Sequence, residues 1–173
     1  MKGAIVKCLS DLVKNNFGEH KWKEIVQQSG ENPHTAILAT SDIDDKTVFK
    51  LIENACKILS LNKQQACDAF GDYWVNTYAP KIYSMYYTQF ENAKQFIMGM
   101  DKIHETVTKS MLNARPPRFA FEEVDDNTII VNYISTRNMI DFYIGLVKGV
   151  GKFFNTPIDI KKLSEERVKL IFS

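Results

Sequence analysis

The sequence predicts an α+β fold, in which a helical N-terminal subdomain precedes an antiparallel sheet packed with helices. Apolar side chains recur every three or four residues through residues 1–115, which is the spacing of one face of an α-helix. In several segments of residues 116–173 they alternate instead, as they do in strands. A chain of 173 residues can bury one core, so we expect a single domain over residues 1–173, mainly helical at 1–115 and sheet-containing at 116–173.

The first part should contain five helices, each with an apolar stripe. Gly18 and Gly30 are expected to end the first two. The acidic segment 42–45 suits the start of the third, because negative charge is favourable at a helix N-terminus. The fourth should stop near Pro80 and the fifth before Pro116. The five stripes are Ile5–Phe17, Trp22–Val26, Val48–Leu59, Ala66–Thr77 and Ala93–Met111.

The second part should contain two pairs of strands separated by one helix. Strands are expected at Phe119–Val124 and Thr128–Ser135, joined by a turn at residues 125–127, where Asp and Asn are common. A strongly amphipathic helix should cover Met139–Phe154. The last hairpin is expected at Ile158–Lys161 and Arg167–Phe172.

Charge and cysteine content exclude several classes of protein. The net charge is +1 with dispersed basic residues, so no nucleic-acid partner is expected. No apolar run approaches the roughly twenty residues that cross a bilayer, and the N-terminus has no apolar signal region, so we expect a cytoplasmic protein without membrane insertion. Cys8, Cys56 and Cys67 are odd in number and lack paired spacing, so neither structural disulfides nor a structural zinc site is expected.

One helical stripe contains a histidine. His104 occupies the apolar face of the fifth expected helix, while Asp101, Lys102, Glu105 and Lys109 are expected on its solvated side. An imidazole that faces a pocket is a good ligand for a transition metal or haem iron. A core histidine satisfied by backbone partners would give the same pattern.

A group of hydrogen-bond donors follows the histidine helix. Alternation along a strand would place Tyr133, Ser135 and Arg137 on one face. A guanidinium can hold a carboxylate through two hydrogen bonds, and the hydroxyl groups add further donors. With His104, these residues suggest a haem pocket, because haem carries iron at its centre and two propionates at its edge.

At this point the chain resembles the haem nitric oxide/oxygen-binding (H-NOX) family, the bacterial relatives of the haem domain of soluble guanylate cyclase. The resemblance covers nearly the whole chain, and its landmarks are residues 1–6, 43–45, 70–74, 100–104, 115–118 and 145–149. It implies that haem b (iron protoporphyrin IX) lies between the two halves. By the resemblance, His104 is the proximal iron ligand, and Tyr133, Ser135 and Arg137 bind the propionates.

The resemblance also assigns supporting roles. Ile5, Pro117 and Leu146 match apolar residues that press on the macrocycle and bend it. Asp45 matches an acidic partner of the arginine, although an ordinary exposed carboxylate at a helix start would look the same. Gly71 and Gly145 are either positions that permit backbone shifts or positions of close packing.

The distal residues predict which gas binds. Family members that bind oxygen stably use a distal tyrosine supported by a tryptophan and an asparagine, and the matching positions here hold Phe142, Leu9 and Trp74. Val75 and Tyr78 match distal positions as well. Loss of the hydroxyl donor disfavours oxygen more than NO or CO, so we expect an NO and CO sensor that largely excludes oxygen. An oxygen-binding protein that uses Trp74 or Tyr78 is the alternative.

The resemblance implies signalling rather than catalysis. NO would break the bond between His104 and iron, and the shift would be read by a separate partner, such as a histidine kinase or a cyclic-di-GMP enzyme. A sensor domain excised from a chemoreceptor or cyclase is an alternative. Two other classes stay open: a haem enzyme, such as a peroxidase or NO dioxygenase, and a haem-free interaction domain.

Overall fold

The computed structural model describes residues 1–109 and 111–173, which form two compact units. The first unit is Met1–Ala66 and the second is Cys67–Ser173. The division falls inside a helix and not at Pro116, where the sequence changes character, because later helices pack with the sheet. Within the described part of the chain, no helix combines the length and hydropathy needed to cross a membrane.

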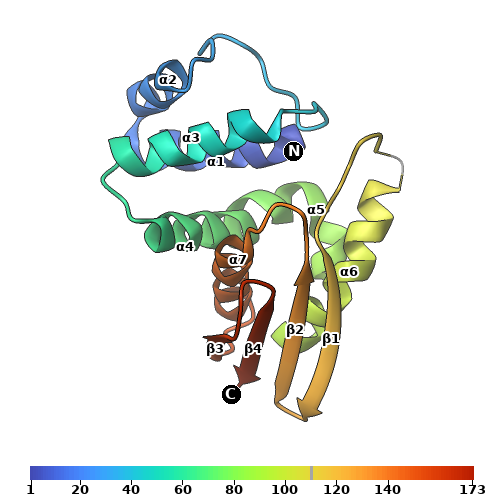
Figure 1. Ribbon diagram of the computed structural model, residues 1–173. Coiled ribbons are helices and arrows are strands. Elements are labelled where there is room, and N and C mark those ends of the chain that lie inside the picture. The colour runs from blue at the N-terminus through green and yellow to red at the C-terminus, as the bar shows by residue number, and fades with distance from the viewer. Residues whose placement is uncertain (110) are drawn as a thin grey trace. The chain divides into compact units, whose positions relative to one another are not determined.

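The first unit is built from helices α1 (Gly3–Phe17), α2 (Glu19–Gln28) and α3 (Asp45–Ile58), drawn from blue to cyan in Figure 1. Gly18, with a φ of 90°, ends α1 and precedes α2, which is a backbone conformation that glycine adopts without steric cost. α2 packs against both α1 and α3. Its core includes the almost fully buried side chains Val6, Cys8, Val13, Ile25 and Val48.

The second unit combines four further helical segments with one sheet. The helices are α4 (Lys63–Tyr73), which begins in the first unit, the π-helical turn η1 (Trp74–Tyr78), α5 (Ala79–Tyr87), α6 (Ala93–Thr108) and α7 (Ile140–Phe153). The strands are β1 (Arg118–Asp125), β2 (Thr128–Ile134), β3 (Ile158–Lys162) and β4 (Arg167–Phe172).

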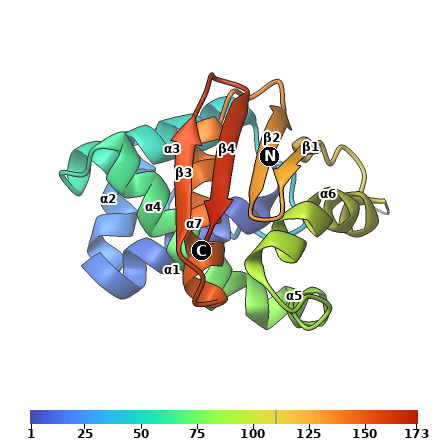
Figure 2. The same ribbon diagram turned by 90° about the horizontal axis from the view of Figure 1, so that it is seen from below.

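The sheet is antiparallel throughout, with the strand order β1-β2-β4-β3 that Figure 2 shows. α6 packs against β1, and α7 packs against α6 and β3 (Figure 1). Alternate residues of β2 and β4 face the core, where Ile129, Val131, Val168 and Leu170 are completely buried. The α+β prediction is therefore confirmed, and every expected helix and strand is present.

Three predicted boundaries were wrong. The fourth helix does not stop at Pro80, because proline falls in the first turn of α5, where its missing N–H is not needed. α6 ends at Thr108, so Met111 lies beyond the helix whose stripe it was expected to continue. β2 ends at Ile134, one residue before the expected end of the strand at Ser135.

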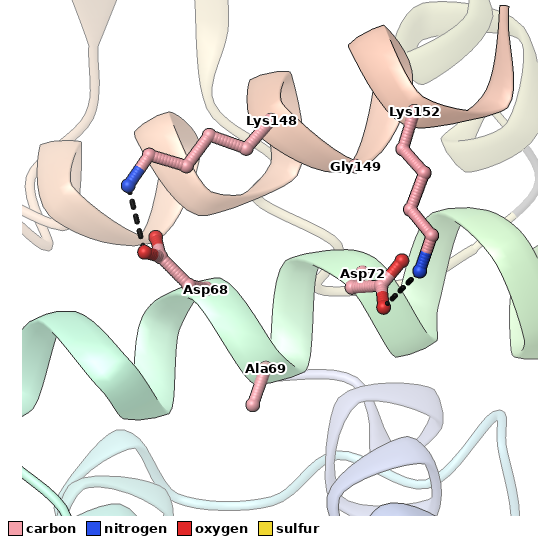
Figure 3. A pocket seen from close by; sticks show the side chains of 6 residues that line it. All are labelled: Asp68, Ala69, Asp72, Lys148, Gly149 and Lys152. Atoms are coloured by element: carbon pink, nitrogen blue, oxygen red, sulfur yellow. Dashed lines mark hydrogen bonds and ion pairs between the residues drawn. The ribbon is translucent and has the colours of Figure 1, made fainter. Parts of the chain in front are cut away.

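α4 and α7 cross at glycines. A Cβ on Gly71 would lie 2.1 Å from the carbonyl carbon of Gly145, and a Cβ on Gly145 would lie 2.2 Å from the carbonyl oxygen of Cys67. Ion pairs join the two helices on either side of the contact, with 2.7 Å between nitrogen and oxygen in both Lys148–Asp68 and Lys152–Asp72 (Figure 3). Close packing is thus an observed role of Gly71 and Gly145.

Candidate functional site

His104 is held in one tautomer by the backbone. Its Nδ1 lies 3.1 Å from the carbonyl oxygen of Pro117, which can only accept a hydrogen bond. Nδ1 therefore carries the hydrogen, and Nε2 keeps an available lone pair. Burial lowers the pKa of His104 below its ordinary value of 6.5, despite the opposing effects of the Pro117 carbonyl and Asp101. The imidazole is consequently neutral at pH 7, as a metal ligand must be.

Asp101, one turn before His104, ties α6 to the start of β1. Its two carboxylate oxygens each lie 2.7 Å from a nitrogen of the Arg118 guanidinium, and one of them accepts the N–H of Phe119 at 2.9 Å. Arg118 holds the pKa of Asp101 to about 2. Because Arg118 directly follows Pro117, this clamp also fixes the carbonyl that orients His104. The expectation that Asp101 is merely solvated was wrong.

Tyr133, Ser135 and Arg137 come together, but not through strand alternation. Tyr133 lies near the end of β2, whereas Ser135 follows the strand and Arg137 lies in a turn. The backbone N–H of Arg137 donates to Ser135 Oγ at 3.2 Å, which folds the turn back toward the strand. The Tyr133 hydroxyl is hydrogen-bonded by Ser135 and by the backbone of Met139. Burial nevertheless raises the pKa of Tyr133, while Arg137 acts to lower it.

The guanidinium of Arg137 is positioned by the chain before β1. One of its nitrogens donates to the carbonyl oxygen of Arg115. This contact joins the segment after α6 to the turn after β2. The turn therefore gathers one cation and two hydroxyl groups, which are donors suited to carboxylates.

Four residues expected on the distal side also come together. The Phe142 ring of α7 lies 4.5 Å from Phe70, between ring centroids. Phe70 is 5.9 Å from Trp74, which is 5.5 Å from Tyr78. Val75 lies between them in η1 and is buried. Phe70 was missed by sequence reasoning, although its spacing of four residues from Trp74 places both rings on one helix face.

An aromatic chain links His104 to the Tyr133 group. Ring centroids lie 5.6 Å apart in His104–Phe119, 5.9 Å in Phe119–Tyr133, 5.0 Å in Phe119–Tyr143 and 5.8 Å in Tyr133–Tyr143. Phe119 was expected only as a strand residue, and its role as the connecting ring was missed. Tyr143 is 6% exposed, and among the described residues its hydroxyl is the buried side-chain polar atom that lacks a hydrogen-bond partner.

The remaining predicted residues divide between the two units. Leu146 packs partly buried against the core of the second unit. Ile5 and Leu9 lie one turn apart on α1, in the first unit. Asp45 begins α3 there and accepts a hydrogen bond from the Met1 amino group at 2.7 Å. The expected roles of Ile5, Leu9 and Asp45 toward residues of the second unit stay predictions.

These residues fit a haem group. His104 presents a neutral imidazole with a free lone pair, and the Tyr133 group gathers donors for carboxylates. The rings between them supply the apolar surface that a flat macrocycle requires. The unpartnered Tyr143 hydroxyl lies in the same aromatic chain and is a further indication that this region accommodates a polar group.

Comparison with known proteins agrees with this chemistry. Residues 2–162 match the model of the Haem-NO-binding family. The chain is 26% identical over 157 residues to soluble guanylate cyclase gcy-32 of Caenorhabditis elegans, covering 88% of this chain and 23% of that protein. It is 25% identical over 166 residues to soluble guanylate cyclase gcy-34 of the same organism, covering 92% and 24%. The chain thus spans about a quarter of the length of these relatives.

Solved H-NOX structures share the fold. A Cs H-NOX mutant with 4-cyano-L-phenylalanine at site 5 gives a TM-score of 0.90 at 25% identity, covering 100% of this chain and 97% of that one. An oxygen-binding H-NOX domain related to soluble guanylate cyclases, in its oxygen complex, gives 0.86 at 25% identity, covering 100% and 95%. An H-NOX protein from S. oneidensis gives 0.90 at 20% identity, covering 100% and 96%, and shows the fold alone. The chain therefore belongs to the Haem-NO-binding family and has the α+β fold of H-NOX domains.

Proposed function

We propose that this chain is a haem-based gas sensor that holds haem b through His104 and responds to NO and CO while largely excluding oxygen. The observation that carries the proposal is the contact between His104 Nδ1 and the Pro117 carbonyl, which leaves Nε2 unprotonated on a neutral ring. When bound, the haem supplies an iron atom that takes a diatomic gas opposite the histidine.

The Tyr133 group is proposed to hold the propionates. Arg137 provides a charge-assisted contact, and the hydroxyl groups of Tyr133 and Ser135 provide further hydrogen bonds. Their mutual contacts hold the three residues before any ligand arrives, so little ordering is required on binding. Pro117, Leu146 and Ile5 are proposed to press on the macrocycle, and Asp45 is proposed to support Arg137.

Selectivity is proposed to follow from the distal wall. Phe142 stacks against Phe70 and carries no hydroxyl group that could donate to bound oxygen. One hydrogen bond to a charged acceptor is worth about 1.5–3 kcal/mol, or roughly ten- to a hundredfold in affinity. NO and CO depend much less on such a donor. The aromatic residues Trp74 and Tyr78, together with Val75 and Leu9, would then shape the pocket without supplying the missing donor.

Signalling is proposed to begin with release of His104. Loss of that tether leaves α6 attached to β1 through Asp101 and Arg118, so the end of α6 beyond this clamp is free to change its position. A separate, cytoplasmic partner such as a bacterial histidine kinase or cyclic-di-GMP enzyme would read the change. Because the curated relatives are about four times longer, a sensor domain within a cyclase or chemoreceptor fits the same chemistry. In either case this domain is proposed to sense and not to catalyse.

Anaerobic absorption spectroscopy of the reduced protein tests the proposal. We expect a five-coordinate ferrous spectrum in the wild-type protein and in His34→Gly, a control at an exposed histidine. His104→Gly should lose that spectrum and recover it when imidazole is added. A wild-type spectrum in His104→Gly, or no haem uptake by any variant, would contradict the proposed ligand.

Exposure of the reduced protein to each gas tests selectivity. The expected result is stable complexes with NO and CO and no stable complex in air. A stable complex in air would overturn the proposed selectivity, and loss of that complex in Trp74→Phe or Tyr78→Phe would identify the donor.

A further inference from the structure

The distal residues lie in a turn with unusual hydrogen bonding. η1 is a single π turn between α4 and α5, and the N–H of Ala79 donates to the carbonyl of Trp74, five residues earlier. A π turn inserts one residue into a helix and rotates the residues that follow, so it must be stabilised by specific contacts. Trp74, Val75 and Tyr78, three of the proposed distal residues, all lie within it.

Asn76, at the centre of the π turn, makes those contacts. Its Nδ2 lies 2.9 Å from Asp72 Oδ1, 3.2 Å from the Asp72 carbonyl oxygen and 3.2 Å from the Gly149 carbonyl oxygen. All three neighbours are acceptors, so the amide must present its NH₂ group and cannot be reversed. The side chain therefore joins η1 both to the preceding turn of α4 and to α7.

The bond to α7 depends on the glycine crossing. A Cβ on Gly149 would lie 2.6 Å from the Gly71 carbonyl oxygen and 3.1 Å from Val75 Cβ. Without that atom the backbones approach closely enough for Asn76 to reach the Gly149 carbonyl. Lys152 Nζ lies 2.7 Å from the other carboxylate oxygen of Asp72, which keeps Asp72 aimed at the crossing (Figure 3).

We propose that Asn76 is a positioning residue for the distal wall. It stabilises the π turn and connects it to α7, the helix that carries Phe142 and Leu146, and so sets the orientation of Trp74 and Tyr78 relative to those residues. Asn76 acts through these neighbours and does not itself contact the gas. The effect on gas binding rests on the proposed function, whereas the effect on the π turn does not.

The first test uses the haem-free protein. The sequence has two tryptophans, so in a Trp22→Phe background only Trp74 fluoresces. Asn76→Leu keeps the side-chain size but removes the donors. We expect a red-shifted Trp74 emission and amide exchange at residues 74–79 about tenfold faster, the cost of roughly one hydrogen bond. Lys148→Met, which breaks only the exposed ion pair with Asp68 at the same crossing, should change neither.

The two variants separate the possible outcomes. Unchanged emission and exchange in Asn76→Leu would overturn the proposal, as would an equal change in Lys148→Met. If Asn76→Leu fails to fold, Asn76→Asp carries the test, because it is isosteric and turns an oxygen toward the same three acceptors. Asn76→Asp should then show the same red shift and faster exchange, and wild-type behaviour in it would refute the role of the NH₂ group.

The second test uses the haem-loaded protein with CO. Asn76→Leu should shift and broaden the C–O stretching band and change the CO release rate by roughly tenfold, while Lys148→Met should match the parent. A parent-like band and rate in Asn76→Leu would refute the link to gas binding. If no variant takes up haem, the proposed function fails, and the haem-free measurements still decide whether Asn76 holds the π turn.

Discussion

Replacing Asp101 with Asn should loosen the clamp that orients His104. A pKa of about 2 in place of 3.8 corresponds to at most about 2.5 kcal/mol of stabilisation by ionised Asp101. The Arg118 side chain is 51% exposed, so solvent screens the pair and reduces this contribution to about 1 kcal/mol. Disturbance of the hydrogen bond to the Phe119 N–H adds a similar amount. We therefore expect Asp101→Asn to lower the free energy of unfolding by about 1–2 kcal/mol at pH 7.

The pH dependence of this loss has a definite sign. The pKa of Asp101 is depressed in the folded protein, so its contribution is fully present above the unfolded value near 3.8. It is lost as the pH falls toward the folded value of about 2. The difference between wild-type protein and Asp101→Asn should therefore be constant from pH 7 to pH 5 and shrink between pH 4 and pH 2.

Urea unfolding of the haem-free protein at several pH values measures this difference. Lys102→Met is the matched control, because it breaks the exposed ion pair with Glu105 on the same helix without touching Asp101. A difference that grows on acidification would refute the assigned direction of the pKa shift. Equal unfolding of wild-type protein and Asp101→Asn at pH 7 would refute the clamp itself.

Three further substitutions test other contacts. Tyr143→Phe should leave the stability of the haem-free protein unchanged or raise it by up to about 1 kcal/mol in urea unfolding, because it removes a buried hydroxyl that lacks a partner among the described residues; a clear loss of stability would show that the hydroxyl is bonded. Phe142→Tyr should add a donor on the distal side and strengthen oxygen binding roughly ten- to a hundredfold, measured by autoxidation and absorption in air, and an unchanged oxygen response would contradict the proposed basis of selectivity. Gly71→Ala should lower stability by about 3 kcal/mol or more in thermal unfolding, since its Cβ would lie 2.1 Å from the Gly145 backbone, and near wild-type stability would show that the two helices can separate without cost.

Local pattern was a good guide to the secondary structure. The apolar spacing in residues 5–17 and 48–59 predicted α1 and α3, because a helix has one period and its buried face repeats with it. The alternation in residues 167–172 predicted β4 for the corresponding reason. Continuation of the helix through Pro80 was missed, since the same residue type permits a helix start and forbids a helix interior.

The candidate site was predictable where one residue type carries the chemistry. His104 interrupts an apolar stripe, and Arg137 closes a short run of donors, so both are visible in the sequence. The contacts that orient them are not. The Pro117 carbonyl belongs to the backbone, and the position of Arg137 depends on a turn that no periodic pattern describes.

The sequence by itself determined which segments are helices and strands, which faces are apolar, and which residues could bind iron and carboxylates. These properties follow from local spacing and from side-chain chemistry. Only the tertiary structure decided the tautomer of His104, the clamp between Asp101 and Arg118, and the π turn held by Asn76. Each of these depends on groups from separate elements meeting at hydrogen-bonding distance, and the period of one element does not specify the groups that the next one presents.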